Sequence, residues 1–248
     1  MTYQIESFIN FNNALEEVSL LIELASESER SPNKYAALNK SALLLLTAKF
    51  EVFVEDVVRE YIEEINSMKL TTPLISNHLK MKHSITRIKE IVEIIEHPNK
   101  EEKRIEVFKE IAKLWSEQEH ETFDDLNIPN KFNYGKHGSK EMEKLFRNIE
   151  IENVFETIVI YTDEENSLLD SVEEIDLKGI INNITNQRNK ISHQDQTPNI
   201  THKDLEGYVD HLNRFSKDLC EYLEGNLYNL NEQYEAFKQV ASQGETAS

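Results

Sequence analysis

Cysteine, glycine and proline are all scarce in this sequence. A single cysteine, Cys220, among 248 residues permits no intramolecular disulfide, which excludes a small secreted fold held together by disulfides. Six glycines and five prolines are too few for the many turns of a β-sandwich or β-barrel. The composition therefore excludes both a disulfide scaffold and an all-β architecture.

Familiar motifs for cofactor and metal binding are missing as well. The sequence has no Gly-rich phosphate loop, no Cys-x-x-Cys and no His-Glu-x-x-His. Residues 133–138 place two glycines around a lysine, but without the Walker spacing, and we interpret them as a turn before a helix at Ser139. We expect neither a cofactor nor a bound metal.

No segment has the character of a targeting or membrane-spanning sequence. Residues 1–13 lack the basic start and apolar core of a secretory signal. The most apolar run, at residues 42–47, is far shorter than the roughly 20 residues that cross a bilayer. We therefore expect a soluble, cytoplasmic protein without membrane contact.

Basic charge is scarce and unevenly placed. The 46 Asp and Glu outnumber the 27 Lys and Arg, for a net charge of −19, which argues against a protein that coats duplex nucleic acid. Residues 67–89, however, contain no acidic side chain and include Lys69, Lys80, Lys82, Arg87 and Lys89. This segment predicts a local RNA contact through Lys80, Lys82 and Arg87. The alternative is a solvated helix face that pairs with acidic neighbours, and the sequence leaves both open.

Apolar residues recur at three- and four-residue steps through almost the whole chain. This spacing predicts amphipathic helices, at about residues 8–25, 35–66, 77–96, 99–115, 139–146, 176–192 and 201–223. The second is apolar nearly all round at residues 42–50, as expected of a central core helix. No repeat or linker divides the chain. We therefore predict a single-domain, all-α helical bundle over residues 1–240, with its core at about 35–225 and a disordered tail at 241–248.

Local signals refine these boundaries. Asn99 with Glu102, and Thr201 with Asp204, have the three-residue spacing of a capping pair at a helix start. Residues 120–138 are polar and aromatic and predict a loop. Residues 151–174 are ambiguous because a strand-like stretch there has no evident partner, and we favour helix or irregular structure.

One polar cluster lies at the end of a predicted helix. Its sequence is Asn186-Gln187-Arg188-Asn189-Lys190-Ile191-Ser192-His193. A histidine can exchange protons with a ribose 2′-hydroxyl or a leaving 5′-oxygen near neutral pH. An arginine fork can hold a phosphate and stabilise charge in the transition state. Arg188 and His193 therefore suit phosphodiester cleavage without a metal, although such a pair is also typical of a helix cap and a surface charge.

The spacing of this pair sets a geometric condition. Five residues along an ideal helix turn two side chains about 140° apart, so one continuous helix does not aim both at one point. Arg188 and His193 converge if the helix ends near Ser192, or if two copies of the chain meet across a two-fold axis.

The sequence from Arg188 to His193 resembles the Arg-x4–6-His signature of the HEPN superfamily of all-α ribonucleases, including the polar Asn189 that often follows the arginine. Residues 42–56, with their acidic Phe-Glu-x-Phe patch, look like the apolar helix of bacterial HEPN-like nucleases of the RiboL-PSP type. Residues 136–146 and 201–205 are similar to the mid-chain segment and the post-motif helix of that group. The resemblance extends over about residues 35–225.

The resemblance implies a helical bundle that dimerises to place two motifs in one cleft. The implied activity is metal-independent endoribonuclease cleavage that leaves a 2′,3′-cyclic phosphate. Carried over by position, His193 is the general acid or base, Arg188 binds the phosphate and Asn189 supports it. Glu51 and Glu55 are weaker candidates for orienting Arg188, and Lys190 is a weak candidate for RNA binding.

The resemblance also bears on partners. Members commonly serve as toxins or as effectors of anti-phage defence, so it implies RNA, a second copy and a cognate antitoxin or defence-system protein as partners. Many relatives continue Ala-His-Gly where this chain has Ser192-His193-Gln194. Some members lack catalysis, and the alternative function is therefore a catalytically inactive HEPN-like module that binds RNA or protein.

Overall fold

A computed structural model describes residues 3–118, 121–133, 137–162, 173–194 and 200–245, with side chains as far as residue 240. These residues form eight α-helices and no β-strand, which confirms the prediction of an all-α domain. The helices are α1 (Glu6–Glu27), α2 (Pro32–Ser67), α3 (Asn77–Glu93), α4 (Glu101–Leu114), α5 (Ser139–Arg147), α6 (Val154–Thr157), α7 (Leu177–Gln194) and α8 (His202–Glu245), with short 3-10 turns at Thr72–Leu74 and Pro98–Lys100.

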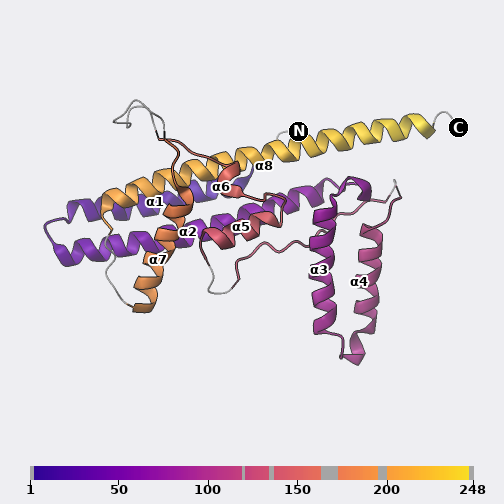
Figure 1. Cartoon of the computed structure of the whole chain (residues 1–248), viewed down its shortest axis with the longest axis horizontal. Helices are drawn as coiled ribbons and strands as arrows, with labels where there is room; N and C mark the ends of the chain where they lie inside the picture. Colours follow the sequence, from indigo (N-terminus) through magenta and orange to yellow (C-terminus); the bar gives the residue numbers. More distant parts are fainter. Residues whose placement is uncertain (1–2, 119–120, 134–136, 163–172, 195–199, 246–248) are drawn as a thin grey trace.

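Three long helices, α1, α2 and α8, run side by side along the long axis of the molecule (Figure 1). α2 begins at Pro32, in the first turn, where a missing amide proton costs no hydrogen bond. It packs against α1, α5, α7 and α8, and is therefore the central helix that the sequence predicted. Phe11 of α1 packs on Phe50 and Phe53 of α2, with ring centroids 5.8 and 5.0 Å apart.

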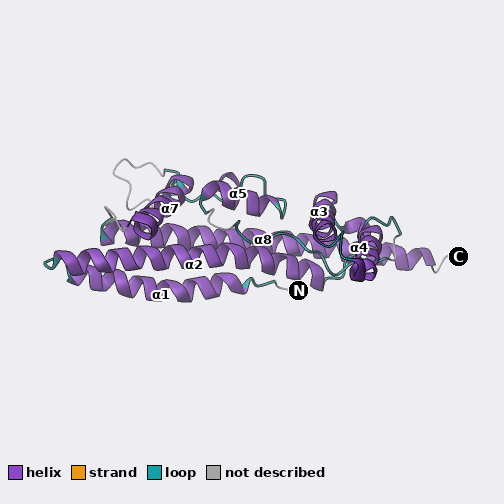
Figure 2. Ribbon diagram, turned by 90° about the horizontal axis from the view of Figure 1, so that it is seen from below, coloured by secondary structure: helices purple, strands orange, loops and turns teal. Residues whose placement is uncertain are grey.

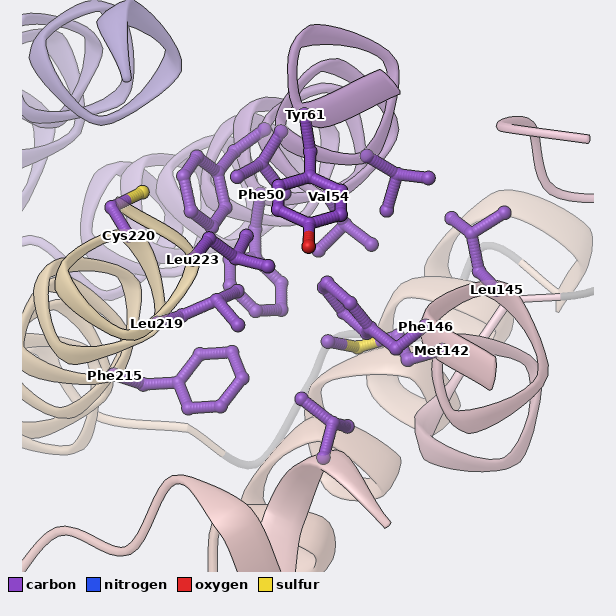
Figure 3. Close-up of a cluster of buried hydrophobic side chains, with 14 of the residues drawn as sticks. Phe50, Val54, Tyr61, Met142, Leu145, Phe146, Phe215, Leu219, Cys220 and Leu223 are labelled. Carbon is purple, nitrogen blue, oxygen red and sulfur yellow. The ribbon is translucent and has the colours of Figure 1, made fainter. Parts of the chain in front are cut away.

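A second layer, made of α5 and α7, lies on the face of α2 and α8 away from α1 (Figure 2). Met142 and Phe146 of α5 point into the space between α2 and α8, toward Phe50, Phe215 and Leu219 (Figure 3). Burial of a side chain such as Phe146, which is fully enclosed, stabilises the fold by about 2–3 kcal/mol. This packing determines where α7 lies, and α7 carries the Arg188 motif.

α8 begins at His202, directly after the capping residue Thr201 that the sequence predicted. The amide of Thr201 donates to Asp204 Oδ2 over 2.8 Å, and the amide of Asp204 donates to Thr201 Oγ1 over 3.2 Å, which confirms this capping pair. The helix continues to Glu245, past residue 241, where the sequence predicted a disordered tail. Residues 230–243 contain neither proline nor glycine, so nothing stops the helix there.

α3 and α4 form an antiparallel hairpin that projects steeply from the three long helices (Figure 1). α3 begins after Ser76, whose Oγ accepts the amide of Leu79 over 3.1 Å. α4 begins only at Glu101, and Lys100 holds its cap position without a side-chain bond. The predicted capping pair of Asn99 and Glu102 is therefore wrong, because the 3-10 turn that Pro98 begins takes up Asn99.

A buried histidine anchors this hairpin to residues 121–128. The His83 ring is fully enclosed, and its Nδ1 accepts the amide of Asn127 over 2.9 Å. The ring proton therefore belongs on Nε2, which lies 3.1 Å from Glu110 Oε1. Burial, reinforced by the Arg87 charge, lowers the pKa of His83 to about 4, so the imidazole is neutral at physiological pH.

The regions without long helices also follow the sequence interpretation. Residues 121–133 and 137–138 contain no helix, as predicted for a loop. After the four residues of α6, Tyr161 pairs with Glu174 in one isolated antiparallel bridge. This agrees with the prediction of helix or irregular structure for residues 151–162 and 173–174, whereas residues 163–172 lie outside the described residues. Among the described residues, every helix is too short or too polar to span a bilayer.

Candidate functional site

The polar cluster of α7 lies where this helix crosses α2. Ile181, Ile184 and Ile191 are buried and hold α7 against the core. Arg188 comes one turn after Ile184, so it lies near the edge of the buried face. Its Nη2 is 3.6 Å from Oε2 of Glu51 on α2, and both side chains are half-buried. The structure therefore brings Glu51 to Arg188.

Asn189 lies beside the arginine. Arg188 Nη1 donates a hydrogen bond to Asn189 Oδ1 over 3.1 Å. The amide oxygen and the Glu51 carboxylate thus contact different nitrogens of the guanidinium group, and together they restrict its orientation. A guanidinium held in this way keeps further N–H donors for an incoming anion.

A histidine that our sequence-based site did not include is the second neighbour of Glu51. His137 Nδ1 lies 3.3 Å from Glu51 Oε1, and its ring meets the Phe132 ring edge to face at 5.5 Å. Glu51 therefore lies between two basic groups, His137 from the loop and Arg188 from α7. The signal that could have found His137 was present, because it lies within the segment whose resemblance we noted.

Glu55, one turn after Glu51, has a different role from the one that we expected. Its Oε1 accepts the backbone amide of Phe132 over 2.8 Å. No described contact joins it to Arg188. It fixes the loop that carries His137 rather than the arginine itself, because it lies one helical turn further along α2.

The start of α5 ties this loop to α7. Gly138 has a φ of +127°, a conformation that residues with a Cβ rarely adopt. Directly after it, the Ser139 amide and hydroxyl both donate to Asn182 Oδ1 of α7, over 3.2 and 2.9 Å. His137 is therefore held between α2 and α7, close to the arginine.

The protonation of Glu51 depends on this arrangement. Burial raises the pKa of the Glu51 carboxyl above its ordinary value, His137 and Arg188 lower it, and Glu55 raises it again. The net direction is upward. The carboxylate is thus more basic than an exposed glutamate.

The space around these residues is too small for a nucleotide. Glu51, His137 and Gly138 line a cavity of about 20 Å³ with apolar neighbours such as Phe132 and Ile184, which is room for about one water molecule. This cavity therefore cannot hold a nucleotide. In the described part of the chain, no group of three His, Cys, Asp or Glu side chains could hold a metal ion.

Comparison with known families decides the assignment. The family model described as RiboL-PSP-HEPN matches residues 9–225, a span that contains Glu51, His137 and Arg188. The chain belongs to the RiboL-PSP-HEPN family. No curated protein and no solved structure matches it.

His193, the other half of the HEPN motif, lies apart from Arg188. It is exposed, and α7 continues past it to Gln194. The condition that the helix ends near Ser192 is therefore not met, and the two side chains leave the helix about 140° apart. Arg188 is directed to α2 while His193 is in solvent. Convergence of this HEPN pair through the meeting of two copies stays a prediction.

Two of the predicted RNA-binding residues contact neighbours within the hairpin. Lys80 is 7% exposed, and its Nζ lies 5.7 Å from the centroid of the Trp115 ring. Burial lowers the pKa of Lys80. Arg87 forms ion pairs with Glu90 and Glu110. Both cations are engaged within the hairpin, so the alternative interpretation, pairing with acidic neighbours, is the correct one for Arg87.

The other two basic residues have more access to solvent. Lys82 is half-buried on α3, and Lys190 is exposed on α7, two residues after Arg188. RNA binding by either residue stays a prediction. Lys190 adds positive charge beside Arg188 and His193 in an otherwise acidic part of the chain.

Proposed function

We propose that this HEPN chain is a metal-independent endoribonuclease whose active site forms between two copies of the chain. The observation that carries the proposal is the arrangement on α7. Arg188 is oriented by Glu51 and Asn189, while His193 stands exposed one and a half turns further along. One chain alone cannot aim both residues at one phosphate, whereas two antiparallel copies of α7 can.

The reaction follows from the chemistry of the two side chains. One His193 imidazole takes the proton of the ribose 2′-hydroxyl, and the 2′-oxygen attacks the phosphorus. The bond from phosphorus to the 5′-oxygen breaks, and the same imidazolium gives that oxygen the proton that it took. The products are a 2′,3′-cyclic phosphate and a 5′-hydroxyl. Arg188 stabilises the negative charge that the phosphoryl oxygens gain in the transition state.

Glu51 contributes by position. Its carboxylate holds Arg188 in place before RNA binds, which reduces the entropy lost on binding. His137, on the other side of Glu51, limits how much the carboxylate can compensate the arginine charge. Asn189 supports the guanidinium from α7 itself, and Lys190 attracts the RNA backbone.

The test is RNA cleavage by the purified protein in EDTA, with the product ends analysed. The wild type is expected to leave cyclic phosphate ends, and His193→Ala is expected to lower the rate at least 100-fold. His97→Ala, which removes another exposed histidine, is the matched control and keeps full activity. Equal rates for His193→Ala and the wild type would refute the proposal.

A second test separates the role of Arg188 from that of a simple charge. Arg188→Lys keeps the positive charge but loses the planar fork. We expect a loss of about tenfold or more in cleavage rate, with circular dichroism unchanged. Wild-type activity in this variant would show that the fork does not bind the phosphate.

The alternative function is a catalytically inactive HEPN module that binds RNA or protein through α7. The net charge of −19 favours it, because two such chains repel RNA except near local basic groups. Binding of RNA without any cleavage would establish this alternative.

If the chain does cleave RNA, it would act in a cell as a toxin or anti-phage effector that a basic partner protein restrains.

A further inference from the structure

The projecting α3–α4 hairpin exposes large apolar side chains in a regular order. On α3 the exposed residues follow steps of four, three and four, with Ile95 in the turn after the helix; Ile105 and Phe108 lie three residues apart on α4, and Trp115 follows at the end of that helix. Such spacing places each set along one stripe of its helix, and the α3 steps are those of a coiled-coil seam. The exposed fractions range from 39 to 61%; the residues are Met81, Ile85, Ile88, Val92, Ile95, Ile105, Phe108 and Trp115.

The contacts between the two helices show where these stripes point. Ser84 and Arg87 of α3 face α4, because Ser84 Oγ accepts the Trp115 indole N–H over 2.8 Å and Arg87 pairs with Glu110. On α3 the exposed stripe comes one residue after Ser84 and Arg87, and on the α4 side Phe108 and Trp115 come one residue after the buried Val107 and Leu114, in each case a rotation of about 100°. Because the helices are antiparallel, the same rotation turns both stripes to the same side of the hairpin.

The two stripes therefore form one apolar face, which we call the hairpin face. The opposite side of the hairpin is covered, since His83 accepts the Asn127 amide there and packs edge to face on Phe123. Eight side chains at about half exposure present on the order of 600–800 Å² of apolar surface, at or above the largest patch of a typical monomer. A stable interface buries about 800 Å² on each partner, so the hairpin face has the size of one.

Charge on the hairpin is separated along its length. The half next to the body, residues 77–89 and 108–115, has six basic side chains and one acidic. The half that contains the tip, residues 90–107, has six acidic side chains and three basic. Residues 77–115 together are nearly neutral, whereas the whole chain has a net charge of −19. Two chains can therefore meet here without the repulsion that acts elsewhere.

We propose that the hairpin face binds the hairpin face of a second copy of this chain, antiparallel, so that the basic half of each lies on the acidic half of the other. A two-fold axis perpendicular to the helices produces this arrangement. With the axis parallel to the helices, like charges meet, and that arrangement is disfavoured. The result is a four-helix bundle with an apolar centre. This contact is on α3 and α4 rather than α7, so it does not rest on the proposed ribonuclease activity.

The first test is the mass of the full-length protein in solution, by light scattering or sedimentation over a range of concentrations. Ile88 lies at the middle of the α3 stripe and is 47% exposed, so Ile88→Glu should fold normally. We expect this variant to have half the wild-type mass, because only the hairpin contact is lost, and unchanged RNA cleavage per chain, because pairing of two copies through α7 is retained. Leu20→Glu, at an exposed leucine of α1, is the matched control and keeps the wild-type mass.

The second test reverses charge and identifies the partner as a second copy. Glu93→Lys with Glu96→Lys makes both halves of the hairpin basic, and Lys82→Glu with Lys89→Glu makes the base more acidic. Each double variant alone should associate more weakly than the wild type, and an equimolar mixture of the two should recover wild-type mass as a mixed complex. A partner other than this chain would not produce that recovery.

The proposal is overturned if the wild type and Ile88→Glu have the same mass at every concentration. It is also overturned if the mixture of charge variants associates no better than either alone. Binding of anionic vesicles that Ile88→Glu abolishes, without any change of mass, would show instead that the hairpin face meets a membrane. Loss of RNA cleavage in His193→Ala bears only on the α7 site, so the two proposals fail independently.

Discussion

The ion pair between Glu51 and Arg188 gives the sharpest prediction from the geometry of the site. It joins the core helix α2 to the HEPN motif on α7, with Oε2 and Nη2 3.6 Å apart. Substituting Glu51→Gln and Arg188→Gln, singly and together, removes each charge, in the case of Glu51 at nearly constant volume. The cycle of four proteins isolates the coupling free energy between the two side chains, because the loss of the His137 contact in Glu51→Gln cancels.

The size of this coupling follows from distance and exposure. Two unit charges 3.6 Å apart attract by about 1 kcal/mol in water and by about 4–5 kcal/mol at an effective dielectric constant of 20. The Arg188 and Glu51 side chains are 26 and 21% exposed, and the separation is longer than a hydrogen bond. Solvent screening therefore keeps the coupling near the lower value, and we expect about 1–2 kcal/mol.

The assay is urea unfolding of the four proteins at neutral pH and low salt, followed by circular dichroism. Arg188→Gln alone is expected to lose more stability than Glu51→Gln, since it leaves a half-buried carboxylate without one of its two basic neighbours. High salt should reduce the coupling only in part, because the pair is half-buried. A coupling below about 0.3 kcal/mol, within the error of additivity, would refute the inference that Glu51 holds the arginine.

Two further predictions concern the fold. The pKa of His83 is lowered to about 4. The stability that the neutral ring provides is therefore complete above pH 6.5 and is lost as the pH falls toward 4. We expect the free energy of unfolding to fall by about 3 kcal/mol over this window. His83→Asn, which keeps an acceptor for the Asn127 amide, should lose that part of the pH dependence, and parallel curves for the two proteins in urea unfolding would contradict the assignment. Phe146→Ala empties the centre of the core and should lower the free energy of unfolding by about 3–5 kcal/mol, whereas Phe108→Ala on the exposed hairpin face is the control with little effect on a single chain.

Much of the fold could be predicted from the sequence because helices and their caps are local. The apolar spacing of α2 and α8 is visible within a few turns, and the Thr201–Asp204 cap needs only three residues. Asn99 failed as a cap because Pro98 begins a 3-10 turn there, and the competition between these two local structures is not visible in spacing alone.

The site was less accessible to sequence reasoning because its contacts join distant segments. Lys80 and Arg87 have the composition of an RNA-binding surface, yet Trp115 and Glu110 of the next helix engage them. The contact of His137 with Glu51 likewise depends on how the loop folds over α2. Residue types predicted the chemistry of Arg188 and His193, whereas the direction in which each side chain points required the packing of α7.

The exposed position of His193 is also the reason for proposing that the motif needs a second copy. A helix that continues to Gln194 directs Arg188 and His193 to different sides. Each chain therefore offers two half-sites that do not meet within that chain. If two chains pair through α7, each His193 serves the Arg188 of its partner. The active unit is then a pair of chains, and each site takes Arg188 from one chain and His193 from the other.

Mixing two inactive variants tests this central claim most directly. Arg188→Ala and His193→Ala are each expected to lack RNA cleavage in EDTA. An equimolar mixture, allowed to exchange subunits, contains pairs with one intact combination of Arg188 and His193, and should recover about a quarter of wild-type activity. No recovery, in a mixture shown to form mixed pairs, would contradict a site shared between two chains.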